Sequence, residues 1–304
     1  MELIYLVLHS LKYTQLRTLL LLYCQRRVIL YNMRGTTMER NERDAIIKII
    51  TAITFLVMVI VNGLANALPI NGVNTGQISD SYPNLFAPAG LTFAIWGLIY
   101  LLLAGYTLYQ LGFFRDHTNA MRSELLSRIG VLFSVSSIAN TAWIFAWHYH
   151  IIPLSMLLMI VILVCLILIN QTMKNQGFSQ REYIFIRLPF SVYFGWITVA
   201  TIANATVLLV SIGWKGFGLA EETWAIIMIS AGLIIAIATI LRNRDIAYGL
   251  VIVWAYAGIL LKHTSSEGFA GQYPAVITTT TVCIFVLLLA EAYILMSARK
   301  RTAI

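Results

Sequence analysis

The sequence predicts an all-α polytopic membrane protein with about eight transmembrane helices. Three observations support this fold class. Hydrophobic residues make up 59% of the 304 residues and charged residues only 11%, whereas soluble domains carry about 25% charged residues. Apolar segments long enough to span a bilayer recur along the chain, and the mean hydropathy is +0.80. The basic residues cluster at alternate ends of these segments, as the positive-inside rule expects.

Residues 1–43 form a basic N-terminal extension. Its short apolar runs, such as Leu3–Leu8, do not reach the roughly 20 residues that a transmembrane helix needs. Two interpretations stay open: a basic amphipathic helix on the inner leaflet, or an upstream extension of a chain that starts at Met33 or Met38. We expect no cleaved signal peptide, because no small-residue cleavage site follows the longest apolar run.

Eight apolar segments of spanning length follow. The fifth is about 30 residues long and has Pro189 in its first third, which predicts a kink or an interfacial first turn. The segments are residues 45–69, 89–111, 125–148, 151–172, 183–212, 223–241, 245–262 and 274–298.

The basic residues predict the orientation of these segments. Of the 21 Lys and Arg residues, all but Lys215 and Lys262 fall on one side of the predicted membrane, the side that carries both termini. The positive-inside rule therefore places both termini in the cytoplasm, in a plasma or inner membrane. The net charge of +8 comes from basic residues on this cytoplasmic side. We therefore attribute the charge to membrane orientation and expect no nucleic-acid partner.

The connection 70–88 predicts an ordered lid on the outer side. A loop of this length without regular structure is usually functional or disordered. Tyr82 and Phe86 favour order, and Pro83 and Pro88 stiffen the chain because each fixes its own φ and restricts the preceding residue.

Polar and aromatic side chains occur at helical spacing in four predicted spans, most of them in the outer halves below the lid, with Trp196 about two turns deeper than Asn204. Trp96 and Tyr100 lie four residues apart and share one helix face. The convergence of such faces below the lid predicts a binding pocket. The other sets are Asn62 with Asn66, Asn140 with Trp143 and Trp147, and Tyr193 with Trp196, Ala200 and Asn204.

These residues also have a structural interpretation. Asparagine in a span often links helices, so we favour packing and lid anchoring for the four asparagines. Tryptophan near an interface usually belongs to the aromatic belt, which we favour for Trp147, Trp214 and Trp224. Pocket lining and helix packing stay equally open for Trp96, Trp143 and Trp196.

Other residues give weaker signals. Glu291 is an acid inside the eighth segment and therefore a functional hypothesis, although an ion pair with Arg299 or snorkelling is favoured over a proton relay. His148 and His150 do not share a helix face, so we expect no metal site. The cysteines predict neither a disulfide framework nor a zinc site, and no catalytic motif predicts a catalytic residue.

The stretch P-x4-P-x7-W-x3-Y, formed by Pro83, Pro88, Trp96 and Tyr100, resembles the first loop and second helix of the translocator protein family, also called tryptophan-rich sensory proteins (TspO/MBR). Two further motifs, Asn140 with Trp143 and Tyr193-x-x-Trp196 with Ala200, Thr201 and Asn204, are similar to the family's third and fifth helices.

The chain also departs from the family pattern. Leu85 and Gly90 occupy places where the family usually has tryptophan, and Val192 replaces the proline before the fifth-helix tyrosine. The resemblance implies a five-helix core in residues 44–212. Residues 213–304 would then be an additional three-helix segment with a basic cytoplasmic tail, so the chain looks like an enlarged, divergent member.

In that family the pocket below the first loop binds porphyrins, haem or related tetrapyrroles, and sometimes sterols. The resemblance therefore implies a membrane receptor or carrier for a planar hydrophobic molecule, with a role in stress sensing or tetrapyrrole regulation. The implied ligand-binding residues are Pro83, Phe86, Pro88, Trp96, Tyr100, Asn140, Trp143, Trp147, Tyr193, Trp196 and Asn204.

Two alternatives stay open. One is a secondary transporter or small-molecule exporter that uses Glu291 as its coupling group, and the other is a Trp-dependent porphyrin-degrading enzyme. We favour a binding protein over an enzyme. We expect that no cofactor is required and that a tetrapyrrole is the possible bound ligand. The lipid bilayer is the expected partner, and a homodimer stays open.

Overall fold

A computed structural model describes residues 39, 41–68, 70–114 and 120–302 of the chain. The predictions for residues 1–38 and 40 lie outside the described residues. Residues Lys48–Ile304 form one compact unit. All regular secondary structure in the described residues is helical.

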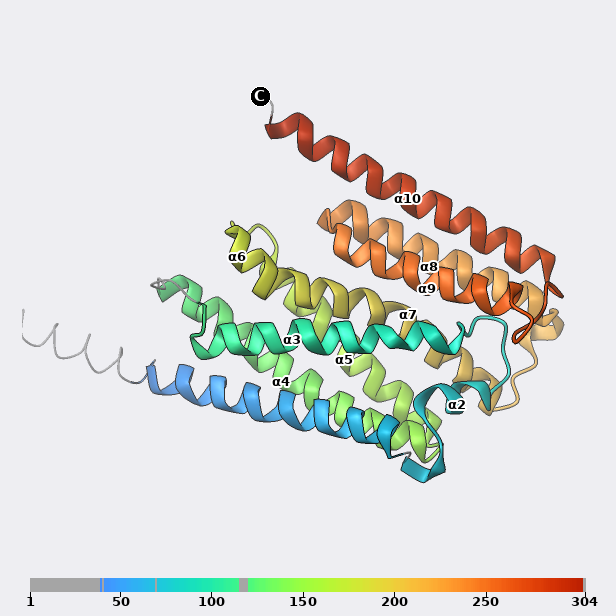
Figure 1. Ribbon diagram of the computed structural model, residues 1–304, viewed down its shortest axis with the longest axis horizontal. Coiled ribbons are helices and arrows are strands. Elements are labelled where there is room, and N and C mark those ends of the chain that lie inside the picture. The colour runs from blue at the N-terminus through green and yellow to red at the C-terminus, as the bar shows by residue number, and fades with distance from the viewer. Residues whose placement is uncertain (1–38, 40, 69, 115–119, 303–304) are drawn as a thin grey trace, which may run out of the picture. The chain divides into compact units, whose positions relative to one another are not determined.

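Eight helices of the described chain are long and apolar enough to cross a membrane, which confirms the predicted all-α polytopic fold class. Neighbouring helices pack lengthwise against one another in Figure 1. The helices are Asn41–Ala67, Gly90–Leu111 including α3 (Ile95–Leu111), α4 (Ala120–His148), α5 (Ile152–Met173), Gln180–Ser211 including α6 (Gln180–Glu182) and α7 (Leu188–Ser211), α8 (Glu221–Asn243), α9 (Ile246–Thr264) and α10 (Pro274–Thr302).

Pro189 lies inside the fifth spanning helix without breaking it. The residues before it, Tyr183–Arg187, form a π-helical turn in which the N–H of Leu188 donates to the carbonyl oxygen of Tyr183. A proline inside a helix clashes with the carbonyl four residues earlier and donates no hydrogen bond. The wider π turn gives the proline ring room, so the helix continues from Gln180 to Ser211.

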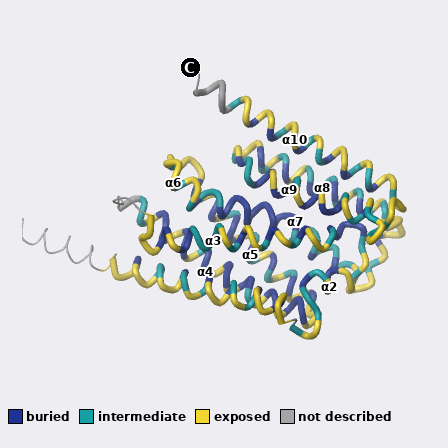
Figure 2. The backbone as a smooth tube through the Cα atoms, viewed as in Figure 1, coloured by how far each residue is buried: buried dark blue, intermediate teal, exposed yellow. Residues whose placement is uncertain are grey.

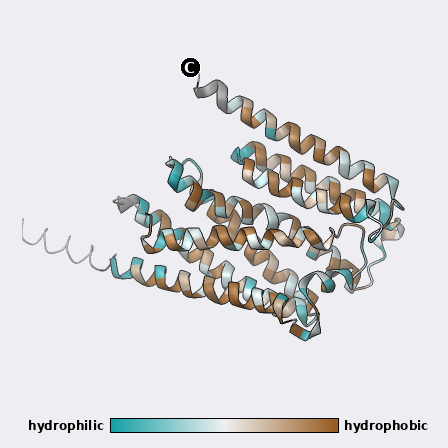
Figure 3. Cartoon of the chain, in the orientation of Figure 1, coloured by the Kyte–Doolittle hydropathy of each residue, from teal (hydrophilic) through white to brown (hydrophobic). Residues whose placement is uncertain are grey.

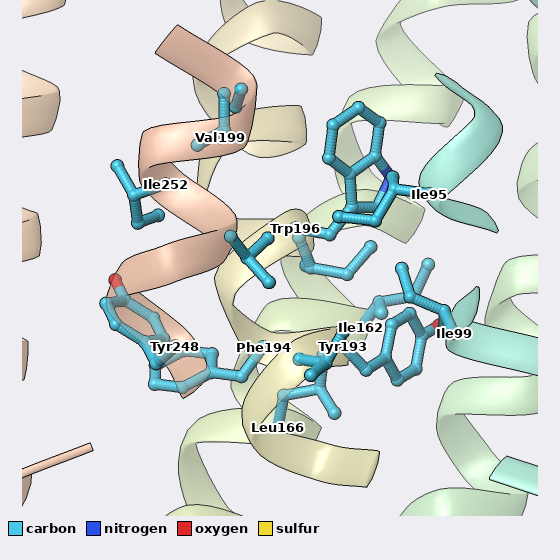
Figure 4. Close-up of a cluster of buried hydrophobic side chains, with 14 of the residues drawn as sticks. Ile95, Ile99, Ile162, Leu166, Tyr193, Phe194, Trp196, Val199, Tyr248 and Ile252 are labelled. Atoms are coloured by element: carbon cyan, nitrogen blue, oxygen red, sulfur yellow. The ribbon is translucent and has the colours of Figure 1, made fainter. Parts of the chain in front are cut away.

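α7 is the central helix of the compact unit. Every residue from Pro189 to Val199 is buried, and Figure 2 shows much of α7 in the dark blue of buried residues. The helix contacts α3, α5 and α9. Figure 4 shows Trp196 on the side of Ile95 from α3, and Phe194 on the side of Tyr248 from α9. A helix that is buried all round needs apolar residues on every face, which the sequence of α7 supplies.

A glycine brings α7 and α9 close together. A Cβ added to Gly195 would lie 2.8 Å from the carbonyl oxygen of Tyr248 and 2.9 Å from the Cβ of Val251. Small residues permit such close contact between membrane helices. α10 packs in turn on α8 and α9. The predicted domain boundary after residue 212 stays a prediction.

The outward faces of these helices are apolar. Figure 3 shows hydrophobic residues along the length of the spanning helices, and many large ones, such as Leu101 and Ile234, are exposed. A water-soluble protein would bury this surface, whereas a membrane helix turns it toward lipid.

Candidate functional site

The lid, residues 70–88, has regular structure of its own. Its short helix α2 (Thr75–Asp80) begins with a capping box, in which Asn74 Oδ1 accepts from the N–H of Gln77 at 2.9 Å and Gln77 Oε1 accepts from the N–H of Asn74 at 2.8 Å. These bonds satisfy donors that the start of a helix leaves free. Asn84 closes a second turn, because its Oδ1 accepts from the N–H groups of Phe86 and Ala87.

One side of the lid is bound to the end of α4. Trp147 Nε1 donates to the carbonyl oxygen of Thr75 at 3.1 Å. The ring of His148 lies between two lid groups, with Nδ1 3.1 Å from the carbonyl oxygen of Ile70 and Nε2 3.2 Å from Thr75 Oγ1. A carbonyl can only accept, so Nδ1 carries the proton and Nε2 accepts from the hydroxyl group. Trp147 and His148 therefore hold the lid in place.

The other side of the lid and the turn after it are bound to α9. Figure 1 shows this stretch crossing from α2 to the start of α3. The N–H of Ala89 donates to the carbonyl oxygen of Gly258 at 3.0 Å, and His263 Nε2 lies 2.9 Å from the carbonyl oxygen of Leu85. Trp254 Nε1 donates to the carbonyl oxygen of Thr92 at 3.0 Å. These α9 residues are not predictable from the sequence, because no single one of them carries a functional pattern.

A cavity of about 530 Å³ lies below α2, and we call it the lid cavity. Three predicted site residues line it together: Trp96, Tyr100 and Trp143. The cavity therefore has an aromatic wall with polar groups beside it, and Asn62 belongs to the same lining. The remaining lining residues are Asn66, Asn74, Thr75, Gly76, Gln77, Asp80, Gly90, Phe93, Ala94 and Ile144.

Trp96 is the centre of the aromatic wall. Its ring stacks on Tyr100 with the centroids 5.4 Å apart and an angle of 19° between the planes. Tyr193 and Trp196 of α7 each meet Trp96 edge to face at 6.1 Å, which is a favoured geometry for aromatic pairs. These two α7 residues lie outside the cavity lining and support the ring that lines it.

Asparagines connect the helices around the lid cavity. Asn62 Nδ2 donates to Asn140 Oδ1 at 2.8 Å, and Asn140 Nδ2 donates to the hydroxyl of Tyr193 at 3.2 Å. Asn204 Oδ1 accepts from Trp143 Nε1 at 3.0 Å, and its Nδ2 donates to Ser155 Oγ at 3.0 Å. The amide groups of Asn140 and Asn204 thus form hydrogen bonds with side chains of other helices, which favours the packing interpretation.

Two donors next to the aromatic wall lack a partner in the part of the chain that the structure describes. Among the described residues, neither the hydroxyl of Tyr100 nor Nε1 of Trp196 forms a hydrogen bond, although both atoms are buried. A buried donor without a partner costs about 1–3 kcal/mol. The hydroxyl of Tyr100 belongs to a cavity-lining residue, so an acceptor on a bound molecule would satisfy it.

Pro83 and Phe86 lie at a second cavity. This cavity has a volume of about 390 Å³ and lies between the lid, the end of α7 and the start of α8. Trp214 and Trp224 form its aromatic side with ring centroids 4.7 Å apart. Pro88 lies in the lining of neither cavity. The other predicted site residues are divided between the lid cavity, its supporting contacts and the second cavity.

No cluster of His, Cys, Asp or Glu that could hold a metal ion occurs among the described residues. The lining of the lid cavity is mixed instead: aromatic rings of α3 and α4 lie beside amide, hydroxyl and carboxyl groups, most of them from the lid. Such a lining suits noncovalent binding of an organic molecule.

Eight membrane-length helices and a covered, tryptophan-lined cavity define the class: an integral membrane protein with an internal candidate site. A family model described as TSPO-like protein matches residues 48–293, and the chain belongs to this family. The match includes α8 and α9 and most of α10 as well as the five preceding spanning helices. Searches of curated proteins and of solved structures found no match.

Proposed function

We propose that this protein is a membrane receptor or carrier that binds a planar hydrophobic small molecule in the lid cavity. One observation carries the proposal: Trp96, Tyr100 and Trp143 line one covered cavity, and the hydroxyl of Tyr100 has no protein partner. Flat aromatic molecules pack well on indole and phenol rings. The cavity volume of about 530 Å³ falls within the range of about 300–1,000 Å³ that is usual for small-molecule sites.

A small residue at position 90 of the cavity lining supports a large ligand, because it takes up little of the cavity. Gly90 lines the lid cavity, and a Cβ added to it would meet no atom within 4 Å. This position resembles one where the translocator family usually has tryptophan, so the lining lacks an indole ring that the family usually has there. A tetrapyrrole, with its flat ring and acidic side chains, is the ligand class we favour.

The proposed ligand would approach from the side that carries the lid. The distribution of basic residues supports an outer lid and cytoplasmic termini. A receptor of this kind would serve in stress sensing or in the regulation of tetrapyrroles.

Titration of the purified protein with protoporphyrin IX tests the proposal. We expect saturable quenching of tryptophan fluorescence. Tyr100→Phe removes a hydroxyl that has no partner among the described residues, so the fold should keep or gain stability. The Kd should rise about fivefold for one lost hydrogen bond. Trp224→Phe, at the second cavity, is the matched control and should leave the Kd unchanged.

Two results would contradict the proposal. Quenching that does not saturate would exclude a defined site for this ligand. A loss of affinity in Trp224→Phe but not in Tyr100→Phe would move the site to the second cavity. Illumination of the saturated complex adds a further readout, because a new absorbing product would favour the porphyrin-degrading alternative.

A further inference from the structure

Glu291 is a buried acid that no group in the described part of the chain balances. It lies inside the spanning part of α10 and is 4% exposed. Neither of its carboxyl oxygens has a hydrogen-bond partner, and no ion pair involves it among the described residues; the side chain of Arg299, its predicted partner, lies outside them. An ionised carboxylate without partners in an apolar interior costs several kcal/mol or more, so such groups become neutral instead.

The carboxyl group rests directly on the backbone of α9. A Cβ added to Gly249 would lie 1.6 Å from Glu291 Oε1 and 2.8 Å from Glu291 Cδ. The carboxyl group therefore takes the place that any larger residue at position 249 would fill. The N–H of Gly249 donates to the carbonyl oxygen of Asp245 and is not free to bind the acid.

Arg187, in the π-helical turn before α7, is engaged with a different acid. Asp245 Oδ2 accepts from Ser191 Oγ at 2.5 Å and lies 3.7 Å from Arg187 Nη2, and its Oδ1 accepts from the N–H of Tyr248. Arg187 also donates to the carbonyl oxygen of Asn243. Asp245 is thus satisfied as a carboxylate, while Glu291 receives nothing from this cluster.

The other helix packed on α10 supplies no counter-charge either. The basic residues at the end of α8 are Arg242 and Arg244, both exposed and neither in an ion pair with Glu291 in the described structure. The hydroxyl of Tyr248 on α9 donates to Thr198 of α7. A proton on the carboxyl group itself is the simplest neutralisation that this environment allows.

We propose that Glu291 is a proton-binding site in the contact between α9 and α10, and that it holds a proton in the structure described. Loss of that proton would place an unpaired charge on Gly249, which only water or a movement of α10 away from α9 could relieve. Because α9 also binds the lid through Gly258 and His263, the proton site lies on the helix that positions the lid.

Infrared spectroscopy of the whole protein in lipid vesicles at pH 7 tests the proposal. We expect a C=O stretching band of a protonated carboxylic acid that shifts in deuterium oxide. The band should lose the area of one carboxyl group per chain in Glu291→Gln. Glu221→Gln is the matched control, because Glu221 is exposed at the start of α8 and should leave the band unchanged.

A second measurement covers the case in which Glu291→Gln does not fold. Wild-type protein labelled with ¹³C in the glutamate carboxyl groups should show the same acid band at the lower frequency of the heavier isotope. Asp245 contains no label and would not shift. Absence of any glutamic acid band at pH 7, or an unchanged band in a folded Glu291→Gln protein, would overturn the proposal.

Discussion

The N–H of Ala89, directly after the lid, donates to the carbonyl oxygen of Gly258, in the middle of α9, across 3.0 Å. The turn after the lid can approach α9 this closely because Gly258 has no side chain to separate them. A Cβ added to Gly258 would lie 2.0 Å from Thr92 Oγ1 and 2.7 Å from Thr92 Cγ2. The position of the lid therefore depends on a glycine in α9.

Gly258→Ala should destabilise the protein. The added methyl group overlaps Thr92, and overpacking of this kind costs about 1–3 kcal/mol. Thermal unfolding of the purified protein in detergent measures the change. Gly97→Ala is the matched control, because Gly97 lies in α3 and a Cβ there meets no atom within 4 Å; its midpoint should stay equal or rise slightly. Equal unfolding midpoints for both variants would show that α9 and the turn after the lid are not in close contact at Thr92.

Trp147→Phe should loosen α2 without unfolding the protein. The change removes the donor to the carbonyl oxygen of Thr75, and a lost hydrogen bond of about 1 kcal/mol corresponds to roughly fivefold faster local opening. Hydrogen exchange followed by mass spectrometry should show faster exchange in peptides covering Thr75–Asp80. Trp254→Phe is the comparison, since it removes the bond to Thr92 and should act on residues 89–94 instead. Identical exchange patterns would contradict separate anchors.

The sequence predicted the helices and the convergence of aromatic faces, but not the partners of those faces. Helical periodicity tells which residues share a face and leaves open which helix that face meets. Trp143 and Asn204 were both predicted site residues, yet only the packing of α4 against α5 and α7 shows that they bind each other.

The lid residues were harder to predict for a related reason. Pro83 and Phe86 belong to a non-repetitive segment, where no period indicates the direction of a side chain, and they lie at the second cavity. Glycines such as Gly249 and Gly258 carry no signal of their own, because a close contact depends on the neighbouring helix.

Asn140→Ala should lower stability by about 1–3 kcal/mol, because it leaves the amide of Asn62 and the hydroxyl of Tyr193 without their bonds in a buried place. Tyr100→Phe should lower porphyrin affinity and leave stability unchanged or higher, because the hydroxyl has no partner among the described residues. The two variants thus separate a residue that packs the helices from one that would contact the proposed ligand. Thermal unfolding and fluorescence titration of each variant measure both quantities. A large affinity loss in Asn140→Ala, at wild-type stability, would instead assign Asn140 to the ligand.

Gly249→Ala and Glu291→Ala should each destabilise the protein, and the two changes together should cost less than their sum. The methyl group added at position 249 would overlap Glu291 Oε1, which lies 1.6 Å from that place, whereas shortening residue 291 frees the space. Side chains in contact show interaction energies of about 0.5–3 kcal/mol in such cycles. Thermal or denaturant unfolding of the wild type, both single variants and the double variant measures this coupling.

Gly97→Ala combined with Glu291→Ala is the control pair, and its two stability costs should be additive, because nothing lies within 4 Å of a Cβ at Gly97. Additive costs for Gly249→Ala with Glu291→Ala would mean that the carboxyl group does not rest on α9.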